Sequence, residues 1–71
     1  KLVFDITDLD EENKAKLRGG ICYFSGDKNN IQVFVKIGED EKNCGAIFVN
    51  NDILNIFRTV LGNERVILIE E

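Results

Sequence analysis

The stretch Leu17–Phe24, LRGGICYF, decides the fold, because it is either the second half of a helix or a helix stop followed by a strand. Four apolar side chains fall within an arc of roughly 120° on a helical wheel: Leu9, Leu17, Ile21 and Phe24. A break at Gly19 leaves this spacing unexplained. The pattern therefore predicts one amphipathic helix over about residues 9–24, with each glycine costing roughly 1 kcal/mol relative to alanine. We expect Gly20 to let this helix approach the sheet closely.

The sequence contains a start signal and a stop signal for this helix. Asp8, with Glu11 three residues later, is an aspartate version of the capping box and predicts the helix start. The stretch SGDKNN, Ser25–Asn30, follows the helix. Gly26 is predicted to close the last turn in the left-handed conformation, and the remaining polar residues are typical of a turn. A phosphate-binding loop needs a strand before it and a helix after it, which is the reverse of the order here.

The rest of the chain predicts four strands and a second helix. The elements expected are a half-buried strand Leu2–Ile6, a strand Ile31–Ile37, a polar hairpin connection Gly38–Asn43, a strand Cys44–Val49, a helix capped by Asn50–Asp52 and ended by Gly62, and a strand Val66–Ile69. The last run is wholly apolar, which favours a central or well-covered strand.

The element order is β-α-β-β-α-β, which indicates the α+β class. Two helices on one face of a four-stranded sheet bury two amphipathic stripes, so we expect a two-layer, ferredoxin-like split βαβ sandwich with an antiparallel middle hairpin. At 71 residues the chain is a single domain, 1–71, near the lower size limit for a self-sufficient core. Because the first residue is Lys1 rather than Met, we expect a C-terminal fragment of a longer protein.

Composition argues against several function classes. The net charge of −4 argues against direct nucleic-acid binding and against docking on anionic membranes. No apolar run approaches the roughly 18 residues of a membrane span, so we expect a cytoplasmic protein. The chain has no histidine, the commonest general base and metal ligand, and we expect no catalytic, cofactor or metal site.

The cysteines and acidic clusters also have structural explanations. Cys22 and Cys44 are too few for a disulfide framework, and two free thiols are favoured over one bridge. The acidic run Asp8–Glu12 lacks the central glycine of a calcium loop, and the run Glu39–Glu41 follows its glycine. Helix capping and a solvated loop explain these runs better.

The aromatic residues invite one further test. The same element order occurs in the RNA-recognition motif, which stacks bases on aromatics of its first and third strands. Phe4 and Phe48 lie on those strands, but no basic residue followed by glycine opens the third strand. We therefore expect core or interface roles for the phenylalanines.

One surface is predicted on the sheet face away from the helices. Phe34 alternates with Val33 and Val35, so it points to the opposite face of its strand. Together with Ile47 and Val49 it would form an apolar patch, which suggests a partner surface. The alternative is a face that tolerates scattered apolar groups.

Four stretches together resemble a known family: LDEEN (Leu9–Asn13), SGDKNNIQVFV (Ser25–Val35), CGAIFVN (Cys44–Asn50) and VLGNERVIL (Val60–Leu68). They are similar to the extreme C-terminal domain of the bacterial replicative DNA polymerase III alpha subunit, and the resemblance covers nearly the whole chain. The chain departs from the family pattern at Lys28–Asn30, where Thr-Pro is common, and at Gly19–Gly20, where bulkier residues are usual.

The resemblance implies a function in DNA replication. The parent would be a DNA-directed DNA polymerase, a nucleotidyltransferase whose metal-binding carboxylates lie elsewhere in its chain. This domain would be a non-catalytic interaction module that docks to the clamp-loader tau subunit and contacts the rest of the polymerase chain. A different class stays open: a small regulatory or ligand-binding ferredoxin-like domain of a metabolic enzyme.

Overall fold

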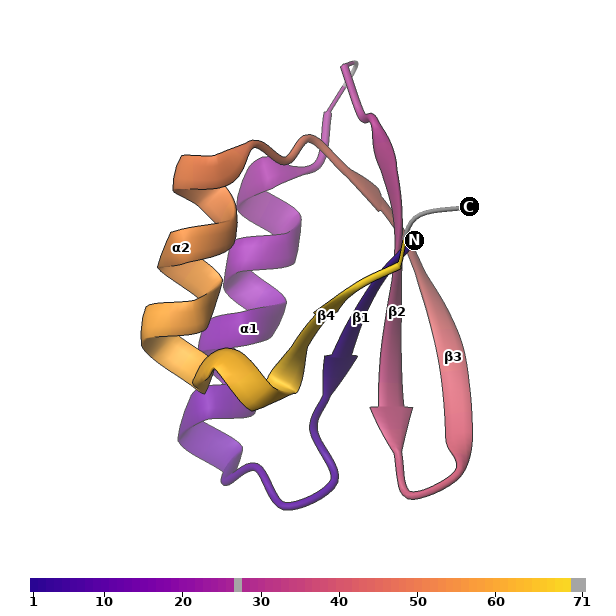
Figure 1. Ribbon diagram of the computed structural model, residues 1–71, viewed down its shortest axis with the longest axis vertical. Coiled ribbons are helices and arrows are strands. Elements are labelled where there is room, and N and C mark those ends of the chain that lie inside the picture. Colours follow the sequence, from indigo (N-terminus) through magenta and orange to yellow (C-terminus); the bar gives the residue numbers. More distant parts are fainter. Residues whose placement is uncertain (27, 70–71) are drawn as a thin grey trace.

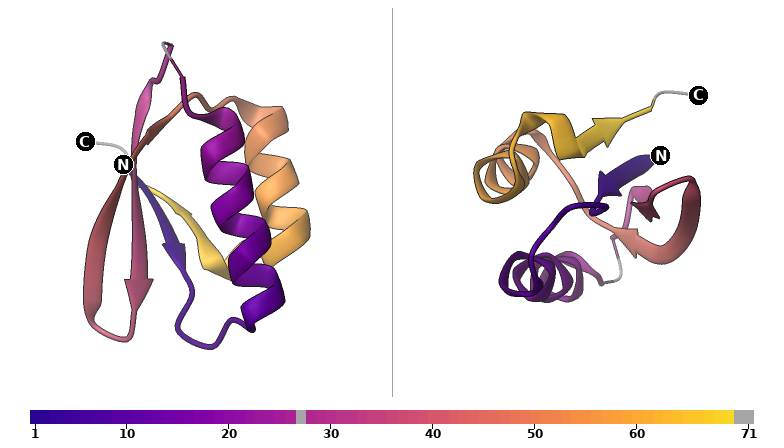
Figure 2. Two further views of the ribbon diagram at one scale, coloured as in Figure 1. Left: turned by 180° about the vertical axis from the view of Figure 1, so that it is seen from behind. Right: turned by 90° about the horizontal axis from the view of Figure 1, so that it is seen from below.

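Two helices cover one face of a four-stranded sheet in the computed structural model of the chain (Figures 1 and 2). The structure describes residues 1–26 and 28–69, so Asp27 of the predicted turn lies outside the described residues. The elements are β1 (Leu2–Asp5), α1 (Glu11–Phe24), β2 (Ile31–Ile37), β3 (Asp40–Ile47), α2 (Asn51–Leu61), a 3-10 turn η1 (Asn63–Arg65) and β4 (Val66–Leu68). The α+β class, the element order and the two-layer arrangement are therefore confirmed.

The sheet has the strand order β3-β2-β1-β4. β1 pairs in parallel with β2, β2 pairs antiparallel with β3 as predicted, and β4 pairs antiparallel with β1. Because Leu2 lies directly opposite Val33, no strand separates β1 from β2, and the first βαβ unit is not split. The strand order therefore differs from that of a ferredoxin-like sheet.

Helix α1 runs unbroken through Gly19 and Gly20, as predicted. Its start is two residues later than expected, because Asp10 rather than Asp8 is the N-cap: the Asn13 N–H donates to Asp10 Oδ1 at 3.0 Å. The predicted left-handed cap at Gly26 is wrong, since Ser25 ends the helix in an extended conformation. The Gly26 N–H donates instead to Asn29 Oδ1 at 3.0 Å, which closes the turn by a side chain.

The hairpin between β2 and β3 is tighter than the sequence suggested. Ile37 pairs with Asp40, so the connection is only Gly38-Glu39, and Gly38 has φ 61° as a two-residue turn requires. The polar residues 40–43, predicted as a loop, form the first half of β3. Their polarity fits a strand at the sheet edge that is exposed to solvent.

The core fills the space between the sheet and the helices. Phe57 of α2 lies at its centre: its ring centroid is 4.8 Å from that of Phe4 and 5.8 Å from that of Phe24. The largest fully buried side chains all come from the sheet: Leu2, Phe4, Val33 and Ile47. α1 lies over the half of the sheet that holds β2 and β3, and α2 over the half that holds β4 (Figure 2).

Gly20 of α1 lies against the Phe57 ring of α2. A Cβ placed there would lie 3.0 Å from Cε1 of Phe57, whereas one at Gly19 would meet nothing within 4 Å. The predicted close approach therefore exists, but it is to α2 rather than to the sheet. The glycine makes room for the ring that fills the core.

These two glycines form a matched pair for a stability test. We expect Gly20→Val to lower the free energy of unfolding by about 1–3 kcal/mol, because its side chain would overlap the Phe57 ring. Gly19→Val should change it by less than about 0.5 kcal/mol, since its side chain points into open space. Urea denaturation of both variants measures the difference, and equal effects would contradict the proposed packing.

Candidate functional site

β4 is an edge strand; its first residue, Val66, is buried, but the three apolar residues that follow are exposed. Ile67, Leu68 and Ile69 are 37%, 41% and 41% exposed. The prediction of a central or well-covered strand is therefore wrong, because β4 lies at one end of the strand order next to β1. A continuous apolar run does not distinguish a central strand from an exposed edge strand.

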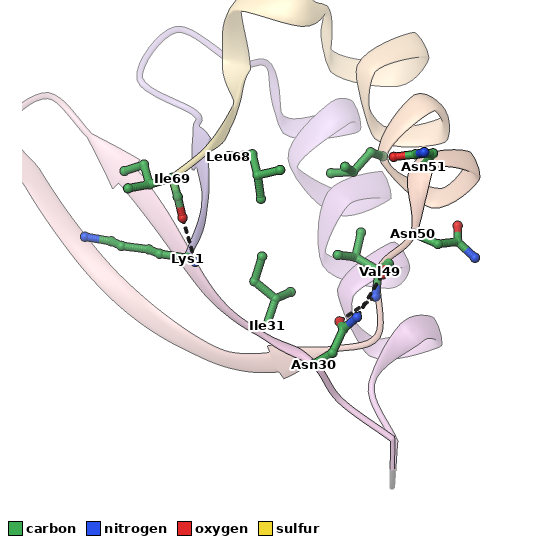
Figure 3. Close-up of a pocket in the computed structure, with 9 residues that line it drawn as sticks. Lys1, Asn30, Ile31, Val49, Asn50, Asn51, Leu68 and Ile69 are labelled. Carbon is green, nitrogen blue, oxygen red and sulfur yellow. Dashed lines mark hydrogen bonds between the residues drawn. The ribbon is translucent and has the colours of Figure 1, made fainter. Parts of the chain in front are cut away.

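A groove of about 550 Å³ lies beside β4, between one end of the sheet and the start of α2 (Figure 3). Figure 3 shows the side chains of Ile31, Val49 and Leu68 converging on the hollow from three different segments. Five apolar residues line it: Ile31, Val49, Leu54, Leu68 and Ile69. Lys1 and three asparagines complete its lining, so polar residues lie beside the apolar walls.

The amide of Asn30 holds one wall of this groove in place. Its Nδ2 donates to the Val49 carbonyl at 3.0 Å, and its Oδ1 accepts from the Val49 N–H at 2.9 Å. These two bonds take the place of backbone hydrogen bonds between strands at Val49, beyond the end of β3. It fixes the segment that leads from β3 to α2, so the groove wall is preformed.

The opposite wall is held by the two ends of the described chain. The Ile69 N–H donates to the Lys1 carbonyl at 2.8 Å, and the Lys1 amino group donates to the Ile69 carbonyl at 3.1 Å. These bonds extend the pairing of β1 with β4. Asn50, one of the three residues predicted to cap α2, is its N-cap and accepts from the Ile53 N–H at 2.9 Å.

Ile47, predicted for an exposed partner surface, is fully buried. Its side chain is 0% exposed and belongs to the core, so this expectation is wrong. The reason is a β-bulge: Val33 pairs with Gly45 but Phe34 pairs with Asn43, which leaves Cys44 as an extra residue. The extra residue shifts the alternation of β3 and places Ile47 opposite Ile31, on the helix side.

The other two predicted surface residues lie apart from each other. Val49 is half-buried against the core and lines the groove. Phe34 is half-buried on the sheet face away from the helices, where Lys1 Nζ lies 4.6 Å from its ring centroid. Lys1 also forms an ion pair with Glu41. Phe34, Ile47 and Val49 therefore do not form one patch.

The acidic residues of α1 and the aromatic residue Phe4 have structural roles. Glu11 and Glu12 form ion pairs with Lys14 and Lys16 along α1, at 3.4 and 3.6 Å. Among residues 1–26 and 28–69, no group of three or more His, Cys, Asp or Glu side chains is placed to hold a metal ion. Phe4 is buried in the core, where it cannot stack on a base.

Among residues 1–26 and 28–69, none of the helices has the length and apolarity needed to cross a membrane.

Asp5, at the end of β1, forms a hydrogen-bond network with Thr7. Its Oδ1 accepts from the Thr7 hydroxyl at 2.7 Å and from the Thr7 N–H at 3.1 Å. These two bonds, hydroxyl first, lower the pKa of Asp5 below its ordinary value. The Thr7 hydroxyl also accepts from the Gly38 N–H at 2.8 Å. The network thus ties the β1–α1 loop to the hairpin, which is a structural role.

No family model, curated protein or solved structure matches the chain. The motifs of the sequence and the geometry of the groove and of β4 are therefore the features that point to a function.

The Asp5 network predicts a pH dependence of stability. Because the folded-state pKa is lowered, the ionised carboxylate stabilises the fold above the unfolded-state pKa, and this contribution is lost as the pH falls through the folded-state pKa. We expect Thr7→Val to raise the pKa of Asp5 toward its ordinary value and to flatten this acid-side dependence. Carboxyl NMR titration measures the pKa. Thr7→Ser keeps the hydroxyl and should leave it low, and an unchanged pKa in Thr7→Val would refute the assignment.

Proposed function

We propose that this chain is a non-catalytic protein-interaction domain of a replicative DNA polymerase III alpha subunit, and that it docks to the clamp-loader tau subunit. The observation that carries the proposal is the exposed apolar edge formed by Ile67, Leu68 and Ile69 beside the preformed groove. The partner comes from the resemblance of the LDEEN, SGDKNNIQVFV, CGAIFVN and VLGNERVIL stretches.

The geometry favours an extended peptide segment as the occupant. An edge strand presents backbone N–H and carbonyl groups on its outer side, and a peptide can add to it as a further strand. The groove beside Leu68 then receives an apolar side chain of that peptide. The chain carries a net charge of −4, so a tau segment with basic residues beside its apolar ones is the complementary partner.

The fold agrees with an interaction role. A two-layer βαββαβ domain is compatible with a ferredoxin-like class, although its strand order differs. We assign no catalytic residue in this chain. Nucleotide transfer by the parent polymerase would use carboxylates and metal ions in other parts of that protein.

A second candidate, a small regulatory or ligand-binding domain of a metabolic enzyme, is favoured by one observation. The groove volume of about 550 Å³ lies in the range of small-molecule sites, and the asparagines that line it offer both donors and acceptors. Such domains commonly dimerise through the sheet. Analytical ultracentrifugation with and without tau separates the two candidates: the polymerase proposal requires a monomer that gains mass only with tau, and a constitutive dimer without tau binding favours the second.

Charge introduced at the β4 edge tests the docking surface. We expect Leu68→Glu to weaken tau binding at least tenfold, about 1.4 kcal/mol, because a carboxylate would have to be buried in the groove. Ile37→Glu is the matched control: Ile37 is 51% exposed and lies at the other end of β2 from Ile31. Isothermal titration calorimetry measures both affinities, and equal weakening by the two variants would contradict the assigned surface.

A further inference from the structure

A second hollow, of about 220 Å³, lies between α1 and β3 and is not used by the proposed function. Three apolar side chains form its floor: Ile6, Leu17 and Ile21. Cys22 of α1 and Cys44 of β3 both line it, together with Lys14 and Arg18. The fold thus brings the two cysteines of the chain, which are 22 positions apart in the sequence, to one site.

The β-bulge is what directs Cys44 to this hollow. Asn43 lies on the sheet face away from the helices, where its Nδ2 donates to Gln32 Oε1 at 3.0 Å. Gly45 pairs with Val33, a core residue, so the extra residue between them turns toward the helix side. Gly45 has φ 104°, and its N–H donates to Asn43 Oδ1 at 2.7 Å, which holds the bulge in this form. A regular strand would place Cys44 opposite Phe34, on the other face.

Cys22 reaches the same hollow from the helix. Lys14 and Arg18 precede it by eight and four residues, which places the three side chains on one face of α1. Both cysteines are free and exposed, so small molecules reach them. The two cations next to them attract anionic compounds.

We propose that Cys22 and Cys44 form a dithiol site that reacts by thiol–disulfide exchange with a small anionic disulfide of the glutathione class. The thiolate of one cysteine attacks a sulfur of glutathione disulfide, which forms a mixed disulfide and releases one glutathione. The second protein thiolate then attacks the protein-side sulfur, which forms the Cys22–Cys44 bond and releases the second glutathione. Two electrons pass from the protein dithiol to the glutathione disulfide, and the two thiol protons end on the two glutathione molecules.

The bond would join α1 to β3 across the hollow. It would close a loop that contains β2, and so restrict the unfolded chain. Oxidation would therefore stabilise the domain without touching the groove at β4. This inference stands independently of the partner assigned above.

Mass spectrometry of the 71-residue chain in glutathione disulfide tests the proposal. We expect the wild type to lose both thiols together, with a mass decrease of about 2 Da, and to pass through one mixed disulfide. Cys22→Ser and Cys44→Ser should each stop at a single stable glutathione adduct of about +305 Da. A wild-type chain that accumulates two glutathione adducts, or that never forms the internal bond, would overturn the dithiol site.

The charge of the hollow is tested separately. The double variant Lys14→Gln, Arg18→Gln should slow reaction with glutathione disulfide several-fold but leave reaction with neutral hydroxyethyl disulfide unchanged. The control Lys16→Gln, Lys28→Gln removes the same charge at positions that do not line the hollow. Equal slowing by both double variants would show that only the overall charge of the chain matters. It would contradict the proposal that the hollow favours anionic disulfides.

Discussion

The packing of the Phe57 ring is the interaction on which the rest of the structure depends. It packs on Phe4 of the central strand β1, on Phe24 of α1, and on the backbone of α1 at Gly20. A single buried side chain thereby fixes both helices to the sheet and to each other. In a domain of this size, where one small core supplies nearly all the stability, such a shared contact sets the spacing of every layer.

The spacing of the layers creates the groove. With α2 held over the β4 half of the sheet, the start of α2 stands beside the ends of β1, β2 and β4, and Leu68 faces the hollow (Figures 2 and 3). The side-chain amide of Asn30 and the backbone of Lys1 then hold its walls by hydrogen bonds to Val49 and Ile69. Ile67 and Leu68 of β4 stay exposed because the strand is at the sheet edge, whereas Val66 is buried in the core. This arrangement supports the proposed peptide-binding surface.

The bulge in β3 is the second organising feature. One extra residue moves Ile47 into the core and turns Cys44 toward α1. The same irregularity therefore removes one residue from the expected surface and builds a different site on the helix side. Bulges commonly redirect side chains in this way, because the side-chain alternation of a strand reverses after each inserted residue.

Local chemistry in the sequence determined the elements of this protein. The apolar spacing of Leu17, Ile21 and Phe24 predicts the unbroken helix α1, and the cap predicted within Asn50–Asp52 and the stop at Gly62 mark the two ends of α2. Helix continuity and helix ends depend on residues within one or two turns of each other, so the local sequence pattern predicts them. The faces of β2 and the α+β class follow from the same periodicity.

Only the tertiary structure decided which elements are neighbours. An apolar run such as Val66–Ile69 is equally compatible with a central strand and an exposed edge, because pairing partners come from distant parts of the chain. Likewise, the bulge at Cys44 depends on the register with β2, and the contact of Gly20 with Phe57 depends on how the two helices cross. The groove and the cysteine pair are therefore products of packing between segments far apart in the sequence, which no local pattern specifies.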